Sequence, residues 1–388
     1  MPFPRHLLAF SPARAFSTAK EVVTSQLNSC GIITFNRPSV LNAFTLPMIN
    51  SIDRSLLRYN DDPKVTHVIL EGAGGKAFCS GGDVVSVVKS IKTGGNLYKN
   101  FFRQEYHLEC FTADFSKPSI ALADGIVMGG GIGLSIHSRF RVATETTKFA
   151  MPEAGIGFFT DAGGGFFLPR LKPDGLGLYL ALTGKILRGS DNIWSGFATH
   201  FIPHKKISEV RDVLTGLRFS PDDNVAAGIL KVLDSYHDKS ATAPSSLEPF
   251  MPLIGKLYGE GGVGVSGTME QLIDMIKAAL AAESKGTPIA QWLEEQLNKF
   301  EQSSPTSLKV ILQQQQRGRK LSLVDVFKME YRLSQRFSQG HDFPEGVRAA
   351  LIDKDKSPKW KPSSLSEVTE DMLQSLFEPL SPIEEWSP

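Results

Sequence analysis

The chain has 388 residues, of which 41% are hydrophobic and 21% are charged. This composition is that of a folded globular protein and excludes a largely disordered chain. The 42 basic and 41 acidic residues leave a formal net charge of +1, so no basic excess indicates a nucleic-acid partner. No apolar run is long enough for a membrane-spanning helix. The 3 cysteines are too few for a disulfide framework and are typical of a reducing compartment.

Residues 1–19 are predicted to be a targeting segment and not part of the fold. They contain Arg5 and Arg14, and the first acidic residue of the chain is Glu21. Arginine-containing segments without acids are typical of mitochondrial transit peptides, whereas the prolines of this stretch disfavour a helix. The sequence therefore predicts a protein of the mitochondrial matrix, with an ordinary frayed terminus as the alternative.

Residues 20–215 alternate between strand and helix patterns. Short apolar runs rich in β-branched residues predict strands at 31–35, 65–70, 119–125 and 141–144. After the first of these, Thr45 offers an N-cap and Pro47 fits a first helical turn, so a helix is expected from residue 46. Strands that alternate with helices favour an α/β fold with crossover connections.

Residues 216–388 are predicted to be mainly helical. Thr268 and Gln271 have the spacing of a capping box, which predicts a helix behind them. Helix starts are also expected at Thr287 and Ser304, each followed by proline, and a fourth helix is expected over 323–333. The glutamine run 313–316 is expected to be a solvated helix face.

Two glycine-rich turns could bind an anionic or polar ligand. The first, KAFCSGGD at 76–83, contains Ser80, and the second, MGGGIGLSIH at 128–137, contains Gly130. Each follows a predicted strand, and the second opens a segment of helical length. Glycine lets backbone N–H groups approach a ligand closely, and a helix N-terminus adds unpaired donors. Two such turns together could form an oxyanion hole.

A third glycine-rich stretch, 151–171, contains two acids, Glu153 and Asp161, among apolar residues. A carboxyl in such surroundings has a raised pKa and could act as a base or a nucleophile, although both acids could also be turn or cap residues. His200 and His204 are four residues apart, but Pro203 breaks the helix that would align them for a metal. A G-x-S-x-G elbow is absent, so a serine hydrolase is unsupported.

In this order and spacing, the three stretches resemble the crotonase (enoyl-CoA hydratase/isomerase) superfamily. Within it, the chain is most similar to the branch that hydrolyses 3-hydroxyisobutyryl-CoA. The similarity covers nearly everything after residue 25 and thins between about 205 and 265. The C-terminal part of the match is specific to that branch, because ordinary hydratases end earlier. Matching stretches are 35–44, 101–108, 117–131, 149–171, 180–191, 196–203, 304–310, 329–335 and 340–362.

The resemblance implies a spiral of ββα units followed by a helical C-terminal region. It implies a coenzyme A thioester as substrate, with the carbonyl oxygen held by the backbone N–H groups of Ser80 and Gly130. By position, Glu105 contacts the substrate, and Glu153 and Asp161 are the catalytic acids. No metal and no separate cofactor are implied, since coenzyme A is part of the substrate.

Departures from the hydratases favour hydrolysis. Hydratases carry a second active-site glutamate where this chain has Gly133, and usually glycine where it has Asp161. The hydrolase branch itself usually has proline at the position of Thr160 and alanine at that of Ser80. The resemblance therefore predicts a thioesterase of valine breakdown that converts 3-hydroxyisobutyryl-CoA to 3-hydroxyisobutyrate and coenzyme A.

Several alternatives stay open at this point. The chain could be an enoyl-CoA hydratase or an isomerase, since some isomerases of the superfamily work with one glutamate. It could also be a non-catalytic subunit associated with the mitochondrial ribosome. The sequence does not choose between a nucleophile and a general base at Glu153, or between 3-hydroxyisobutyryl-CoA and 3-hydroxypropionyl-CoA. A homo-oligomer is compatible with the superfamily, and Lys76 is a candidate contact for the coenzyme A phosphates.

Overall fold

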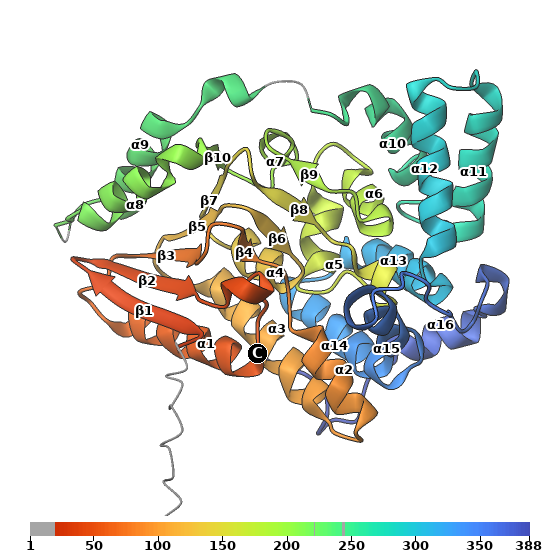
Figure 1. The fold of residues 1–388 in the computed structure, drawn as a ribbon, viewed down its shortest axis with the longest axis horizontal. Coiled ribbons are helices and arrows are strands. Elements are labelled where there is room, and N and C mark those ends of the chain that lie inside the picture. Colours follow the sequence, from red (N-terminus) through yellow and green to blue (C-terminus); the bar gives the residue numbers. More distant parts are fainter. Residues whose placement is uncertain (1–19, 221, 243–244) are drawn as a thin grey trace, which may run out of the picture.

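The computed structural model describes residues 20–220, 222–242 and 245–388, so the predicted targeting segment 1–19 lies outside the described residues. The described chain contains two sheets (Figure 1). The larger has the order β1(Val22–Leu27), β2(Cys30–Phe35), β3(His67–Gly72), β5(Ser119–Ala123), β7(Phe140–Ala143) and β10(His200–Phe201). The smaller has the order β4(Ala77–Cys79), β6(Ile126–Met128), β8(Lys148–Ala150) and β9(Leu187–Arg188). The four predicted strands correspond to β2, β3, β5 and β7, with ends shifted by one or two residues.

Strands of the two sheets follow one another in pairs along the chain. β3 and β4, β5 and β6, and β7 and β8 each place one strand in the larger sheet and the next in the smaller one. Within each sheet these successive strands are parallel neighbours, as in the register Ala77↔Ile126 between β4 and β6. The loops that follow β4 and β6 therefore emerge side by side. This repeated ββα arrangement is the predicted spiral.

Helices of the N-terminal half pack on this framework. They are α1(Leu46–Asp61), α2(Val84–Lys92), α3(Leu97–Asp114) and α4(Gly130–Ile136), followed by the short helices α5(Gly164–Phe167), α6(Leu176–Thr183) and α7(Asp191–Trp194). As predicted, α1 begins after Thr45, whose Oγ1 accepts a hydrogen bond from the N–H of Met48 at 3.2 Å. The buried side chains of α1 pack in one core with those of α3 and the strands.

The region 216–388 is helical as predicted, and from residue 207 onward the chain is mainly helical. Its helices are α8(Ile207–Gly216), α9(Val225–Tyr236), α10(Met251–Tyr258), α11(Met269–Ala282), α12(Pro288–Gln302), α13(Pro305–Gly318), α14(Leu323–Gln339), α15(Asp342–Val347) and α16(Glu370–Phe377). The capping box of Thr268 and Gln271 is present, and α12 and α13 begin after Thr287 and Ser304. None of the described helices is long and apolar enough to cross a membrane.

The proposed division after residue 215 falls in the last turn of α8, which packs against α9. α8 and α9 contact each other and share a small core with the outer face of the larger sheet, which includes Ile69 and Leu122. Helices from α10 onward share the main core with α1, α3 and the inner strands, from Val22 to Trp386. The division into two regions remains a prediction. Side chains of the helical region pack in the same core as the helices and strands of the N-terminal half.

The expectation for the glutamine run 313–316 is wrong at its centre. Gln314 and Gln315 are 0% and 2% exposed, and both lie against the turn that contains Thr160. The hydropathy of glutamine predicts solvent, but its amide can satisfy buried backbone and hydroxyl groups where a loop needs partners. These two side chains belong to the interior of the site region.

Candidate active site

A cavity of about 710 Å³ opens where the loops after β4 and β6 meet helix α3. All five residues singled out from the sequence line it: Ser80, Glu105, Gly130, Glu153 and Asp161. Three aromatic side chains also line it, Phe101 and Phe102 of α3 and Phe158 of the loop after β8. Concave, mainly apolar cavities of this size with a few polar groups are typical of small-molecule sites.

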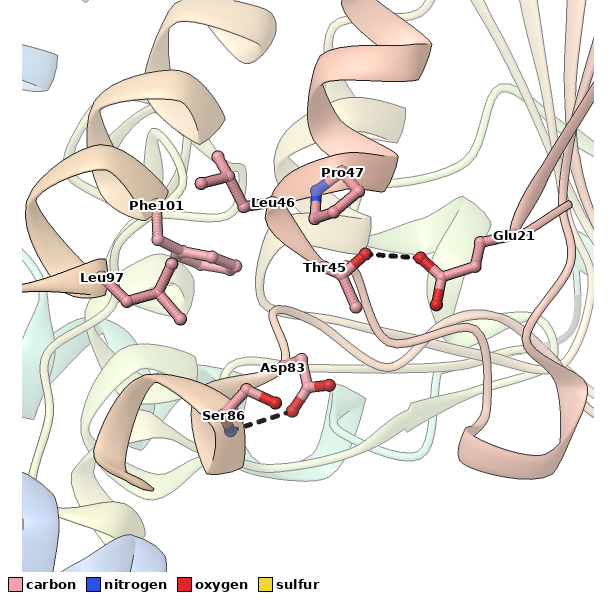
Figure 2. Close-up of a pocket in the computed structure, with 8 residues that line it drawn as sticks. All are labelled: Glu21, Thr45, Leu46, Pro47, Asp83, Ser86, Leu97 and Phe101. Atoms are coloured by element: carbon pink, nitrogen blue, oxygen red, sulfur yellow. Dashed lines mark hydrogen bonds between the residues drawn. The ribbon is translucent and has the colours of Figure 1, made fainter. Parts of the chain in front are cut away.

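A second cavity of about 260 Å³ adjoins the first and shares Asp83, Ser86 and Phe101 with it. Figure 2 shows that its two carboxylates already have partners. The carboxylate of Glu21 accepts from Oγ1 of Thr45 at 2.8 Å, and that of Asp83 accepts from the N–H of Ser86 at 3.1 Å. These bonds stabilise the starts of α1 and α2. The larger cavity is therefore the candidate active site.

The two glycine-rich turns lie in contact at the floor of the larger cavity. A Cβ on Gly81 would lie 3.4 Å from the carbonyl oxygen of Met128, and Gly81 itself has φ +105. The backbone conformation favours glycine, and a Cβ at this distance would be in ordinary van der Waals contact. The turn after β4 is thereby held against the N-terminus of α4, where Gly130 occupies the first helical position.

The N–H expected from Ser80 is already used, because it donates to the carbonyl of Leu41 at 3.0 Å. On the same turn, the N–H of Gly82 makes no hydrogen bond to any residue that the structure describes. Gly130 is at the start of α4, where N–H groups have no partner within the helix. Free donors beside the cavity therefore include the N–H groups of Gly82 and Gly130. A single sequence carries no signal for which N–H of such a turn pairs with a neighbouring segment.

Glu153 is positioned by the 3₁₀ turn Glu153–Ile156, directly after β8. It is 6% exposed, and its Oε2 has no hydrogen-bond partner among the described residues. Its Oε1 lies 3.6 Å from the position of a Cβ on Gly129, so the carboxyl faces the glycine-rich turn before α4. Burial, and then the charge of Asp161, raise the pKa of Glu153 well above its ordinary value.

Asp161 lies in the wall of the same cavity and is 7% exposed. Burial raises its pKa to about 7, and a hydrogen bond from the hydroxyl of Tyr106 opposes this rise. The next residue, Ala162, has φ +57, a left-handed conformation that costs energy outside glycine. The turn must therefore be held by its surroundings.

Helices α13 and α14 pack against α5, the short helix that follows this turn. The carboxyl of Glu330 accepts from the N–H groups of Gly163 and Gly165 at 2.8 and 2.9 Å. Gln314 donates to the carbonyl of Thr160 at 2.7 Å and accepts from its hydroxyl at 3.0 Å. The helical C-terminal region thus shapes the site directly, and sequence reasoning missed both of its contributing side chains.

Glu105 enters the cavity wall from α3, one helical turn before a second buried acid, Glu109, which no sequence motif marks. Burial, and then the charge of Asp161, raise the pKa of Glu105 well above its ordinary value.

Lys89 and Lys354 are exposed at the rim of the cavity, whereas Lys76 does not line it. Among the residues described, no group of three or more His, Cys, Asp or Glu side chains could hold a metal ion.

Comparison with known families and structures agrees with this geometry. A model of the enoyl-CoA hydratase/isomerase family matches residues 30–377. The chain belongs to the enoyl-CoA hydratase/isomerase family. It superposes on the crystal structure of a carnitinyl-CoA dehydratase from Mycobacterium thermoresistibile with a TM-score of 0.82 and 35% identity, over 94% of this chain and 98% of the other. It superposes on an enoyl-CoA hydratase from Rhodobacter sphaeroides with a TM-score of 0.80 and 32% identity, over 95% of this chain and 99% of the other.

Curated relatives of this family member are similar over most of their length. The mitochondrial 3-hydroxyisobutyryl-CoA hydrolase of Xenopus laevis is 47% identical over 350 residues, which are 89% of this chain and 86% of the relative. The human protein of the same name is 44% identical over 365 residues, 93% of this chain and 89% of the relative. The predicted fold and superfamily are confirmed.

Proposed function

We propose that this family member is a thioesterase that hydrolyses 3-hydroxyisobutyryl-CoA to 3-hydroxyisobutyrate and coenzyme A. The observation that carries the proposal is the position of the Glu153 carboxyl, which faces the turn before α4 beside two free N–H donors. The position at which hydratases place a second glutamate is Gly133 in this chain. The names of relatives at 44% and 47% identity support the same activity.

The thioester carbonyl oxygen accepts hydrogen bonds from the N–H groups of Gly82 and Gly130, which stabilise the negative charge that develops during attack. Removing one donor of such a pair typically slows a reaction by about 10²–10³-fold. Gly82 replaces Ser80 in this role because the N–H of Ser80 is engaged with Leu41. Both donors are backbone groups on turns fixed by the sheet, so they need little reorganisation during the reaction.

Glu153 acts on the carbonyl carbon in one of two ways. As a nucleophile, its carboxylate forms a mixed anhydride and the coenzyme A thiolate leaves, after which water hydrolyses the anhydride. As a general base, it takes a proton from the water that attacks directly. Single turnover in ¹⁸O-labelled water separates the two, because only attack of water on the enzyme carbonyl of an anhydride places label in the Glu153 carboxyl.

The other acids recognise the substrate and orient Glu153. Glu105 accepts a hydrogen bond from the 3-hydroxyl of the acyl group. The carboxyl of Asp161 lies in the same cavity wall, and its charge raises the pKa of Glu153. Lys89 and Lys354 at the rim are placed to attract the phosphates of coenzyme A. The reaction requires no metal and no cofactor beyond the coenzyme A of the substrate.

The proposed setting is the mitochondrial matrix, where the reaction would serve valine breakdown. The relatives at 44% and 47% identity carry the word mitochondrial in their names, and the acid-free N-terminal segment suits import. 3-Hydroxypropionyl-CoA, which lacks one methyl group, is a second proposed substrate, since a missing methyl costs only about 10–200-fold in selectivity. Assembly as a homo-oligomer belongs to the same proposal.

Hydration of an enoyl-CoA is the second candidate, because the two solved relatives at 35% and 32% identity are a dehydratase and a hydratase. Thiol release from 3-hydroxyisobutyryl-CoA, measured beside loss of the double bond of crotonyl-CoA, separates the two activities. The proposal requires thiol release from 3-hydroxyisobutyryl-CoA and an unchanged double bond in crotonyl-CoA. Double-bond loss without thiol release would favour the hydratase.

A further inference from the structure

Helix α3 carries a buried acid that the proposed mechanism does not use. Glu109 lies one turn after Glu105, is 1% exposed, and does not line the cavity. Neither of its carboxyl oxygens has a hydrogen-bond partner within the described part of the chain. Leaving a buried carboxyl unpaired is costly, so this group must either find a partner or lose its charge.

Two glycines of α4 make the room for these acids. A Cβ on Gly130 would overlap Oε1 of Glu105 and would lie 3.7 Å from Oε1 of Glu109. A Cβ on Gly133 would overlap the carboxyl of Glu109. The two carboxyls therefore lie against the first turn of α4, and their Oε1 atoms approach the same point beside Gly130.

The groups around Glu109 are acidic or neutral. Those that act on its ionisation are Glu105 and Cys110 of α3, Asp161 of the cavity wall and Glu330 of α14. Burial, and then the charge of Glu105, raise the pKa of Glu109 well above its ordinary value, and none of these four groups is cationic. A neutral acid is the stable form in such a setting, and it has one O–H to donate.

The acceptor placed for that O–H is Oε1 of Glu105. This oxygen is itself sealed from solvent and has no partner in the described structure. Glu105 nonetheless borders the cavity, so its other oxygen, Oε2, is the one directed to the substrate. One hydrogen bond between the two acids would satisfy Glu109 and fix the orientation of Glu105.

We propose that Glu109 is a positioning residue: it remains a neutral acid and donates a hydrogen bond to Oε1 of Glu105, so that Oε2 of Glu105 accepts from the substrate hydroxyl. The pairing of the two glutamates rests on the burial of both carboxyls and on their common approach to Gly130, and is independent of the proposed function. The consequence for the hydroxyl rests on the proposed function.

Infrared difference spectroscopy tests the pairing without any activity measurement. The spectrum of Glu109→Gln is subtracted from that of the wild type at neutral pH, with substrate absent. We expect the variant to lose the carbonyl stretch of one protonated carboxyl and to keep its folded circular dichroism. If no protonated-carboxyl band is lost, Glu109 is ionised and the pairing is wrong.

Kinetics tests the positioning role. Glu109→Leu removes the donor at similar volume, whereas Glu109→Gln keeps an N–H donor at the same place. With Leu, KM for 3-hydroxyisobutyryl-CoA should rise about tenfold, the loss of one hydrogen bond. KM for isobutyryl-CoA, which lacks the hydroxyl, should stay constant, and Gln should restore most of the discrimination. Equal changes for both thioesters would overturn the role.

These results also separate the inference from the proposed function. A wild type that releases no thiol from 3-hydroxyisobutyryl-CoA, with the infrared band present and lost in Glu109→Gln, would remove the proposed function and retain the paired acids. Thiol release by a wild type that lacks the infrared band would support the proposed function and overturn the pairing of the two acids.

Discussion

The hydroxyl of Tyr106 donates a hydrogen bond of 3.0 Å to Oδ2 of Asp161 inside the wall of the cavity. Tyr106 follows Glu105 on α3, so one helix supplies both an acid of the site and the donor that restrains another. A hydrogen bond to the charged form favours ionisation, which opposes the effect of burial on Asp161. The balance of these two effects leads to a prediction about pH.

We predict that kcat/KM for thioester hydrolysis rises with pH above the ordinary titration range of a carboxyl. Glu153 must be ionised to attack or to accept a proton, and burial raises its pKa well above the ordinary value of 4.5. The acidic limb of the profile should therefore lie above that ordinary range, and a limb near pH 4–5 would contradict the account.

Tyr106→Phe should move that limb toward lower pH. Without the hydroxyl, the pKa of Asp161 rises by about one unit or more, because the carboxylate loses a bond worth about 1.5–3 kcal/mol and one pH unit corresponds to about 1.4 kcal/mol. Asp161 then stays neutral to higher pH, so its charge raises the pKa of Glu153 less. The measurement is the pH profile of both proteins, and coincident profiles would show that this bond has no influence.

The buried acids should make the fold less stable as pH rises above 7. Asp161 and Glu330 have pKa values raised to about 7 and about 8, against ordinary values of 3.8 and 4.5. The folded protein therefore holds protons that the unfolded chain has released, and this stability is lost as pH rises through the folded pKa values. Above pH 7 the buried His137, with its pKa lowered to about 4, is neutral in both states and adds no slope.

Urea unfolding at pH 7.0, 7.5 and 8.0 measures this loss. Each retained proton contributes a slope of at most about 1.4 kcal/mol per pH unit. Glu330→Gln should unfold with a smaller slope, although its stability is lower because an amide replaces one acceptor of the turn at Gly163. A free energy of unfolding that increases between pH 7 and 8 would contradict the protonated state of these two buried acids.

Gly133→Ala should destabilise the protein by about 1–3 kcal/mol, the usual cost of overpacking. Its Cβ would overlap the Glu109 carboxyl and lie 2.8 Å from Cβ of Ala162. Gly216→Ala is the matched control, since a Cβ there has open space at the end of α8. Chemical denaturation of both variants checks this, and equal stabilities would show that α4 can move away from α3.

Thr160→Val should lower kcat and cost about 1–3 kcal/mol of stability. The hydroxyl of Thr160 bonds with the buried side chains of Gln314 and Gln315, and Val leaves those amides without it. The adjacent Asp161 would then be held less firmly. Thr24→Val on the edge strand β1 is the control, because that hydroxyl forms no hydrogen bond among the described residues. Full activity of Thr160→Val would show that the amides are not needed.

Local sequence signals account for much of the fold. Thr45, Thr268 and Ser304 each cap a helix at the predicted place, because an N-cap interaction involves residues only a few positions apart. The short apolar runs that predict the strands are likewise signals carried by neighbouring residues. The parallel contact of β4 with β6, which joins the two glycine-rich turns, depends on the whole spiral and followed from family resemblance only.

The parts of the site that escaped prediction depend on distant partners. Gln314 and Glu330 hold a turn more than 150 residues away in sequence, and no local pattern marks them. The choice of Gly82 over Ser80 as a free donor likewise depends on a pairing with Leu41. Glu109 is the exception, since its spacing of four from Glu105 places both acids on one helix face.

The most direct test of the central claim compares thiol release from 3-hydroxyisobutyryl-CoA by the wild type and by Glu153→Gln. Gln keeps the size of the side chain and removes its ability to attack or to accept a proton. The account predicts release by the wild type and a loss of at least about 10²-fold in the variant, with the thioester still bound. Glu153→Gln hydrolysing at the wild-type rate would contradict it.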